Sequence, residues 1–198
     1  MQAPFWKATG SQADMLKADF IAIARACASV GIHILVVPLV DGGRLESQAE
    51  EDQLVAFLLE LQGLLAELGL IVTFESDFTP SEVARFISRL PEGGFGINYD
   101  IGNSAALGYS ASEEFAAYGP RIVNVHVKDR VLGGTTVPLG TGNADFETVF
   151  SLLARWRYQG NLILQTARAI DGDHERVLCK YRDQVIQWMN CHEVAIRA

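Results

Sequence analysis

The sequence has little cysteine, and this scarcity narrows the compartment in which the protein is expected to work. Its 198 residues include three cysteines, Cys27, Cys179 and Cys191, which are widely spaced and form no CxxC pair. An odd number of scattered thiols does not make a disulfide framework. We therefore expect a reducing compartment, with the cytoplasm as the default.

The sequence also lacks a long apolar run and an excess of positive charge. Residues 1–20 mix lysines and acids, so we expect neither a signal peptide nor a membrane anchor, and no membrane partner. Lysine and arginine number 16 against 24 acids, a net charge of −8, which disfavours binding to nucleic acid. A small anionic substrate held by a few local arginines is compatible with this charge.

The sequence does contain an alternation of strand-like and helix-like segments. A hydrophobic content of 49% predicts one soluble globular domain over residues 1–198. Apolar, β-branched runs alternate with segments of helical periodicity, and short links join them, which is typical of βα repeats in a parallel sheet. Strands are expected at 32–40, 70–77, 95–102, 121–129 and 161–168, and helices at 14–30, 47–68, 79–90, 111–119, 145–158 and 173–191.

Four successive predicted strands end with a residue that can bind a metal or hydrogen-bond to a ligand. These residues are Glu75, Asp100, His126 and Gln165. In a parallel βα barrel the side chains of an active site project from the carboxyl ends of the strands, so residues distant in sequence converge there. Two carboxylates, an imidazole and an amide form an oxygen-rich donor set. Such a set is more typical of an Mn²⁺, Mg²⁺ or Co²⁺ site than of a thiolate-type zinc site.

Each of these residues also has a purely structural interpretation. A lone histidine at a strand end is more often a hydrogen-bonded structural residue than a ligand, and a terminal acid often just begins a polar loop. Four strand ends in succession shift the balance, because buried charges rarely persist without a partner. The glycine-rich loop 133–146 can present backbone N–H groups to an anion, although it matches no nucleotide-binding fingerprint.

The stretches "FESD", "NYDIGNSAALGY", "VNVHVKDR", "VPLGTGNADF" and "LILQTAR" occur in this order. With them the chain resembles the xylose isomerase-like superfamily of TIM barrels, in particular its sugar-phosphate isomerase and epimerase branch, over about residues 20–190. The resemblance implies one divalent metal ion, Mn, Mg, Co or Zn. Its implied ligands are Glu75, Asp100 and His126, with Gln165 at a position where the family commonly has a second glutamate.

The same resemblance implies roles for further residues. Glu75 would move a proton beside the substrate carbonyl, and Lys128 would stabilise the oxyanion or pair with a carboxylate. Gln165 can offer an oxygen to a metal but cannot take a proton, so one-base isomerisation is expected rather than two-base epimerisation. Asn103, Arg130 and Arg168 are the candidate substrate contacts, although Asn103 also suits a turn and the arginines also suit a solvent-exposed surface.

The resemblance implies an α/β fold that is a partial TIM barrel. A complete barrel has eight strands, and the motifs align the five predicted here with the last five, so the chain is expected to be an N-terminally shortened barrel. Open strand edges favour aggregation, so we expect a homodimer that covers the open barrel edge.

Three functions are compatible with these residues. The first is a metal-dependent isomerase or epimerase of a small sugar or sugar phosphate. The second is a catalytically impaired, shortened barrel that acts as a binding or assembly module, which Gln165 and the strand count favour. A phosphodiesterase of the apurinic-site endonuclease type is disfavoured, because such enzymes use several zinc ions and more than the four histidines present here.

Overall fold

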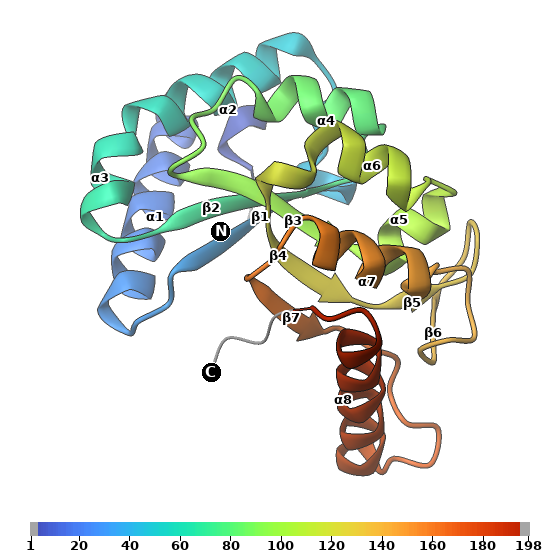
Figure 1. Ribbon diagram of the computed structural model, residues 1–198. Coiled ribbons are helices and arrows are strands. Elements are labelled where there is room, and N and C mark those ends of the chain that lie inside the picture. Colours follow the sequence, from blue (N-terminus) through green and yellow to red (C-terminus); the bar gives the residue numbers. More distant parts are fainter. Residues whose placement is uncertain (1–3, 195–198) are drawn as a thin grey trace. The chain divides into compact units, whose positions relative to one another are not determined.

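The computed structural model describes residues 4–194, and Figure 1 shows strands that alternate with helices along the chain. The strands are β1 (Ile34–Leu39), β2 (Ile71–Ser76), β3 (Phe95–Asp100), β4 (Ile122–Val127), β5 (Asp129–Arg130), β6 (Thr136–Val137) and β7 (Asn161–Leu164). The α-helices are α1 (Gly10–Ser29), α2 (Gln48–Glu60), α3 (Gln62–Glu67), α4 (Pro80–Ile87), α5 (Ile101–Leu107), α6 (Ala111–Tyr118), α7 (Phe146–Arg155) and α8 (His174–Cys191). Short 3-10 helices are η1 (Phe5–Lys7), η2 (Asp41–Gly43) and η3 (Gly119–Arg121).

A parallel sheet organises this part of the chain. Its strands follow the order β1-β2-β3-β4-β7, while β5 and β6 form a separate antiparallel pair. Val36 lies opposite Thr73, Asp100 opposite His126, and Val127 opposite Leu164. The predicted α/β fold with five parallel strands is therefore confirmed for the described residues, among which no helix is long and apolar enough to cross a membrane.

The chain divides into two compact units, each with its own core. The first comprises the chain up to Ser76 together with Arg85–Gly96, and the second comprises Asp77–Ala84 together with the chain from Ile97 onward. In the first unit, the rings of Phe5, Phe20 and Phe57 meet edge to face, with centroids 4.7 to 6.2 Å apart. Edge-to-face packing is a favourable geometry for aromatic pairs. These three contacts therefore hold η1, α1 and α2 together.

A buried carboxylate ties two helical segments of the first unit together. Glu51 of α2 is 4% exposed and accepts hydrogen bonds from Arg85 at 2.6 and 2.7 Å. Arg89 donates to the same carboxylate and to Asp52. The hydrogen bond from Arg85, supported by that from Arg89, lowers the pKa of Glu51, so this carboxylate is buried together with its counter-charge.

In the second unit the helices pack on one face of the strands. Val125 and Val127 of β4 are fully buried, as is Phe150 of α7. Phe146 of α7 stacks on Trp188 of α8, with ring centroids 4.3 Å apart and planes 10° from parallel. The opposite face of the strands carries the side chains of the candidate site.

Two segments differ from the elements expected from the sequence. The helix expected over 47–68 is two helices, α2 and α3, because regular helix stops at Leu61, close to Gly63, a residue of low helix propensity. The segment after Asp100, expected as the end of a strand and a loop, is helix α5. That helix begins directly at the strand end, which brings its first turn into the candidate site.

A second buried carboxylate, without a cation, joins β3, α5 and α6. Glu114 is 3% exposed and accepts O–H hydrogen bonds from Tyr99 at 2.9 Å and from Tyr118 at 2.8 Å. Ser104 donates a further hydrogen bond to the same carboxylate. Burial raises the pKa of Glu114 and outweighs the opposing effect of the three hydroxyl donors.

We predict that Glu114→Gln makes the protein more stable relative to wild type as the pH rises. A carboxyl with a raised folded pKa favours the native state below its ordinary pKa, and this contribution is lost as the pH rises through the folded value. Each unit of pKa elevation corresponds to about 1.4 kcal/mol, and glutamine keeps the shape without the charge. Urea denaturation at about pH 5 and about pH 8 measures the difference. Glu113→Gln, at an exposed neighbour, is the control, and equal pH dependence of E114Q and wild type would contradict the prediction.

Candidate functional site

The polar residues predicted at strand ends lie at the carboxyl ends of the strands. Glu75 is the penultimate residue of β2 and His126 that of β4, whereas Asp100 is the last residue of β3. Gln165 directly follows β7, and its N–H donates to the Val127 carbonyl at 3.1 Å. Active-site side chains of parallel βα folds converge at these strand ends.

Asp100 connects its strand to the helix that follows. Its side chain is 1% exposed, and its Oδ1 accepts the backbone N–H of Asn103 at 2.8 Å, which makes Asp100 the N-cap of α5. The other oxygen, Oδ2, lies 3.7 Å from His126 Nδ1 and 3.1 Å from Lys128 Nζ. One carboxylate therefore starts a helix with one oxygen and faces the site with the other.

Two buried asparagines orient the His126 ring. Asn124 Nδ2 donates to Asn98 Oδ1, which leaves Asn98 Nδ2 facing His126 Nδ1 at 3.2 Å. An amide N–H can only donate, so this arrangement favours the neutral imidazole with its proton on Nε2 and a lone pair on Nδ1. A metal ion bound at Nδ1 would take the lone pair that accepts this hydrogen bond, and so would replace the Asn98 contact.

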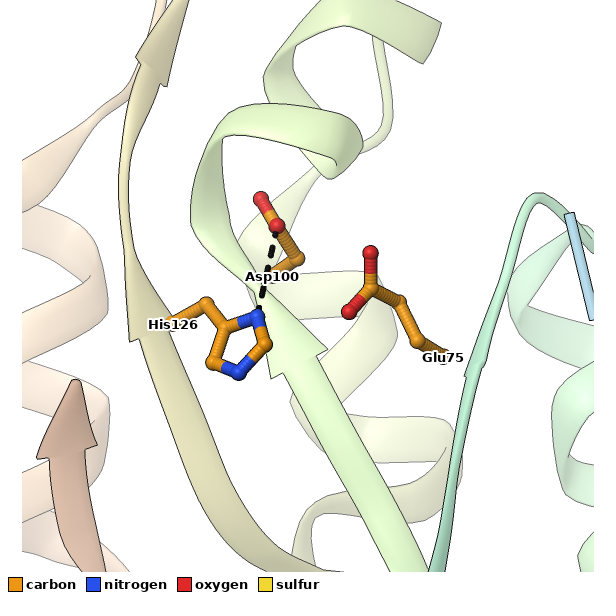
Figure 2. Close-up of side chains that lie close together, drawn as sticks. All are labelled: Glu75, Asp100 and His126. Atoms are coloured by element: carbon orange, nitrogen blue, oxygen red, sulfur yellow. Dashed lines mark ion pairs between the residues drawn. The ribbon is translucent and has the colours of Figure 1, made fainter. Parts of the chain in front are cut away.

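Figure 2 shows Glu75 beside the Asp100 and His126 pair. Each of the three residues offers one potential ligand atom, and these atoms lie within 4.8 Å of one another. Asp100 is buried, whereas Glu75 and His126 are partly exposed. Among residues 4–194 this is the group of carboxylate, imidazole and thiol side chains whose spacing could hold a metal ion.

Lys128 places a fixed positive charge next to these ligands. Its Nζ donates to Asp100 Oδ2 at 3.1 Å, to Asn103 Oδ1 at 3.0 Å and to Gln165 Oε1 at 2.8 Å. An ammonium group has three N–H donors, and three oxygens therefore account for all of them. The hydrogen bond from Lys128 uses one lone pair of the Gln165 oxygen, and the second lone pair is available to a metal ion.

A glycine makes room for the lysine. A Cβ atom on Gly102 would lie 2.6 Å from Lys128 Cγ and 3.0 Å from Lys128 Cβ. Real Cβ atoms do not approach other carbons so closely. The first turn of α5 therefore needs glycine at position 102 so that the Lys128 stem can cross it.

The side chains of Arg130 and Asp129 form hydrogen bonds with other groups of this chain. Arg130 donates to the Gly134 carbonyl from Nε and Nη2, and to Asn103 Oδ1 from Nη1 at 2.9 Å. Asp129, which is 1% exposed, accepts the backbone N–H groups of Gly140 and Gly142, at 2.9 and 2.8 Å, and that of Ala144 at 3.1 Å. The glycine-rich loop therefore surrounds an anion, as its sequence suggested, but that anion is the protein's own carboxylate.

Arg168 lies apart from this network. It is exposed in the loop that follows β7, and it lines a cavity of about 630 Å³ together with Lys128 and Gln165. The structure thus brings Asp100, His126, Lys128 and Gln165 together at the strand ends, with Arg168 further along the adjoining cavity.

Several residues of the site were absent from the sequence-based candidates. Asn98 and Asn124 are buried polar residues inside apolar strands, two positions before Asp100 and His126, and this spacing places them on the same face. That pattern is visible in the sequence as polar interruptions. Gly102 and Asp129 gave no such signal, because their roles depend on partners brought close by folding.

Comparison with known proteins identifies the family of this fold. Residues 4–180 match the family described as xylose isomerase-like TIM barrel. An inosose dehydratase from Clostridium botulinum (strain Alaska E43 / Type E3) is 26% identical over 184 residues, and the match covers 74% of this chain. The chain spans 61% of the length of that relative.

Solved structures share the fold at low sequence identity. A xylose isomerase domain protein from Planctomyces limnophilus superposes with a TM-score of 0.78 at 17% identity, covering 98% of this chain and 72% of that one. A D-tagatose 3-epimerase-like protein gives 0.75 at 19% identity, covering 97% and 75%. Further matched structures hold magnesium or zinc.

We predict that Gly102→Ala destabilises the protein by about 1–3 kcal/mol, because the added methyl group overpacks the Lys128 stem. The control is Gly63→Ala in α3, where a Cβ meets nothing within 4 Å. That change should leave stability unchanged or raise it by up to about 1 kcal/mol, since alanine is the better helix former. Urea denaturation compares the two variants. A G102A protein as stable as G63A would show that the close approach of Lys128 is not required.

Proposed function

Because this chain belongs to the xylose isomerase-like TIM barrel family, we propose that it is a metal-dependent isomerase or epimerase of a sugar or sugar phosphate. The observation that supports this most strongly is the pairing of buried Asp100 with partly exposed His126 on neighbouring parallel strands, with a Glu75 oxygen in the same cluster. Ionisable groups gathered at a strand end cost solvation energy, and binding a cation there offsets that cost.

The donor set suits one divalent metal ion. Glu75, Asp100 and His126 would hold it, and the second lone pair of the Gln165 oxygen would make that residue the fourth ligand. The 3.7 Å separation of His126 Nδ1 and Asp100 Oδ2 supports this assignment, and a metal ion would replace the contact of Nδ1 with Asn98. The oxygen-rich set favours Mn²⁺, Mg²⁺ or Co²⁺, and Zn²⁺ also binds such ligands. When bound, the ion would polarise a substrate carbonyl and the adjacent hydroxyl.

Glu75 is the proposed base. It would remove the proton from the hydroxyl-bearing carbon beside the carbonyl and return it to the former carbonyl carbon. The hydroxyl proton would pass to the former carbonyl oxygen, and the two transfers together interconvert a ketose and an aldose. Lys128, fixed by Asp100 and Asn103, would stabilise negative charge on the substrate oxygen while the proton is on Glu75. Because Gln165 cannot take a proton, a single base carries the reaction in this proposal.

A single base is also enough for other reactions of the same type. The removal of water beside a carbonyl begins with the same proton abstraction, and one relative is named inosose dehydratase. The substrate in either case is a small polyol with a carbonyl group. Asn103 and Arg168 are the proposed substrate contacts. The contacts of Arg130 favour an indirect role for it, in which it holds Asn103 in place.

The second candidate function is a binding or assembly module without catalysis. Gln165 supports this candidate, because its oxygen already accepts a hydrogen bond from Lys128 and it supplies no negative charge to a metal ion. The cluster of Glu75, Asp100 and His126 argues against it, because three potential ligand atoms within 4.8 Å of one another suit a metal ion.

The decisive experiment follows solvent deuterium into substrate. Metal-loaded protein in D₂O, given a panel of ketoses, aldoses and their phosphates, should label the carbon beside the carbonyl. Glu75→Gln should lower the rate of labelling and turnover by about 100-fold or more, because glutamine cannot exchange the proton. Chelation of the metal should abolish both activities.

Glu67→Gln, at an exposed position on α3, is the matched control and should behave as wild type. Labelling by E75Q at the wild-type rate would remove Glu75 from the mechanism. If metal-loaded wild type neither labels nor converts any member of the panel, the binding-module function takes precedence.

We also propose that a second copy of the chain covers the open edges of the sheet. β1 and β7 are its end strands, and each presents an exposed apolar side chain, Val36 at 38% and Ile163 at 43%. Unpaired strand edges with apolar side chains promote association.

Sedimentation velocity should therefore show a dimer. Ile163→Lys should raise the dimer dissociation constant by about tenfold or more, because the dimer interface would bury the unpaired charge of the lysine. Leu59→Lys changes a residue that is 42% exposed on helix α2, which is not part of either end strand, and is the control. A wild-type protein that stays monomeric at high concentration would contradict the dimer.

A further inference from the structure

The cavity that begins at Lys128 and Gln165 has a volume of about 630 Å³, enough for several carbon atoms of a sugar. Lys128 stands at the end of β4, and Arg168 comes from the loop after β7. Thr136 and Val137 of the β5–β6 hairpin line it as well. All of these residues belong to the second compact unit.

The charge of this cavity is opposite to that of the whole chain. The protein carries a net charge of −8, yet the described residues that line the cavity include two cations and no carboxylate. The charge of Lys128 is balanced by Asp100 at 3.1 Å. The nearby acids Asp171 and Asp173 form ion pairs with Arg176.

In the part of the chain that the structure describes, the charge of Arg168 is not balanced by an ion pair of this kind. Within residues 4–194 its guanidinium makes no hydrogen bond and no ion pair with the protein. The other groups that could attract an anion are already bound, since Arg130 donates to Gly134 and Asn103, and the glycine-rich loop donates to Asp129. Arg168 is therefore the cation available to a ligand in this cavity.

We propose that Arg168 selects substrates whose end remote from the carbonyl carries an anionic group, a phosphate ester or a carboxylate. The inference rests on the proposed function, because it places the substrate carbonyl at the Lys128 end of the cavity, beside the proposed metal ligands. A guanidinium binds either anion through paired N–H groups, and the hydroxyls of Thr136 and Thr166 add further donors along the cavity. Val137 and Pro138 line the wall that the carbon chain would cross.

A binding measurement tests the anion site without any need for turnover. Isothermal titration calorimetry with inorganic phosphate is carried out on metal-loaded wild type, Arg168→Gln and Arg182→Gln. Arg182 is an exposed arginine of α8 that pairs with Asp183 and lines no part of the cavity. The R168Q change should weaken phosphate binding by about tenfold or more, and R182Q should match wild type. Equal phosphate affinity in R168Q and wild type would overturn the proposal.

A kinetic measurement identifies the anion. The panel is a ketose, the same ketose with a terminal phosphate, and the ketouronate with a terminal carboxylate. For each anionic compound, kcat/KM is divided by the value for the neutral ketose. The site selects the anionic group of the compound whose ratio falls by about tenfold or more in R168Q.

The two proposals fail in different ways. If phosphate binding depends on Arg168 but none of the three compounds is converted, the anion site stands and the isomerase function is wrong. If the neutral ketose is converted and R168Q changes neither the ratios nor phosphate binding, the function stands and the anion site is wrong.

Discussion

The candidate site depends on how one buried carboxylate, that of Asp100, is held. One of its oxygens caps helix α5 through the N–H of Asn103, and the other faces Lys128 and the imidazole of His126. An N-cap contributes about 1 kcal/mol, while a buried ion pair that loses one partner costs about 3–5 kcal/mol. The same side chain therefore sets the start of a helix, the position of a lysine and the edge of the ligand cluster. A change at Asp100 would disturb all three features together.

The balance of charge explains why a glutamine is compatible with this cluster. Glu75 and Asp100 bring two negative charges, and Lys128 returns one positive charge through a direct contact with Asp100. A divalent ion held there would leave an excess of one positive charge, which suits a substrate that develops negative charge on oxygen. Gln165 accepts from Lys128 without adding to the negative charge. The same excess, together with Arg168, makes this end of the strands favourable to an anionic ligand.

The strands and the residues at their ends could be predicted because they follow from local pattern and from one rule of parallel sheets. Apolar runs bounded by turn residues mark β1, β2, β3, β4 and β7, and parallel neighbours deliver their final residues to a common edge. Helix α5 escaped prediction because its N-cap, Asp100, also reads as the polar end of a strand. The orientation of His126 by Asn98 and Asn124, the need for Gly102 beneath Lys128, and the loop around Asp129 all depend on contacts between residues distant in sequence. Arg130 resembled a substrate contact in the sequence, but its hydrogen bonds go to Gly134 and Asn103.

The central claim is that Glu75, Asp100 and His126 bind one divalent metal ion. An anomalous difference map, recorded at the manganese absorption edge from crystals grown with Mn²⁺, tests it most directly. The account predicts one strong peak within about 2.0–2.3 Å of a His126 nitrogen and of an oxygen from each carboxylate. A map without a peak at these three side chains, or with manganese bound elsewhere, would contradict it.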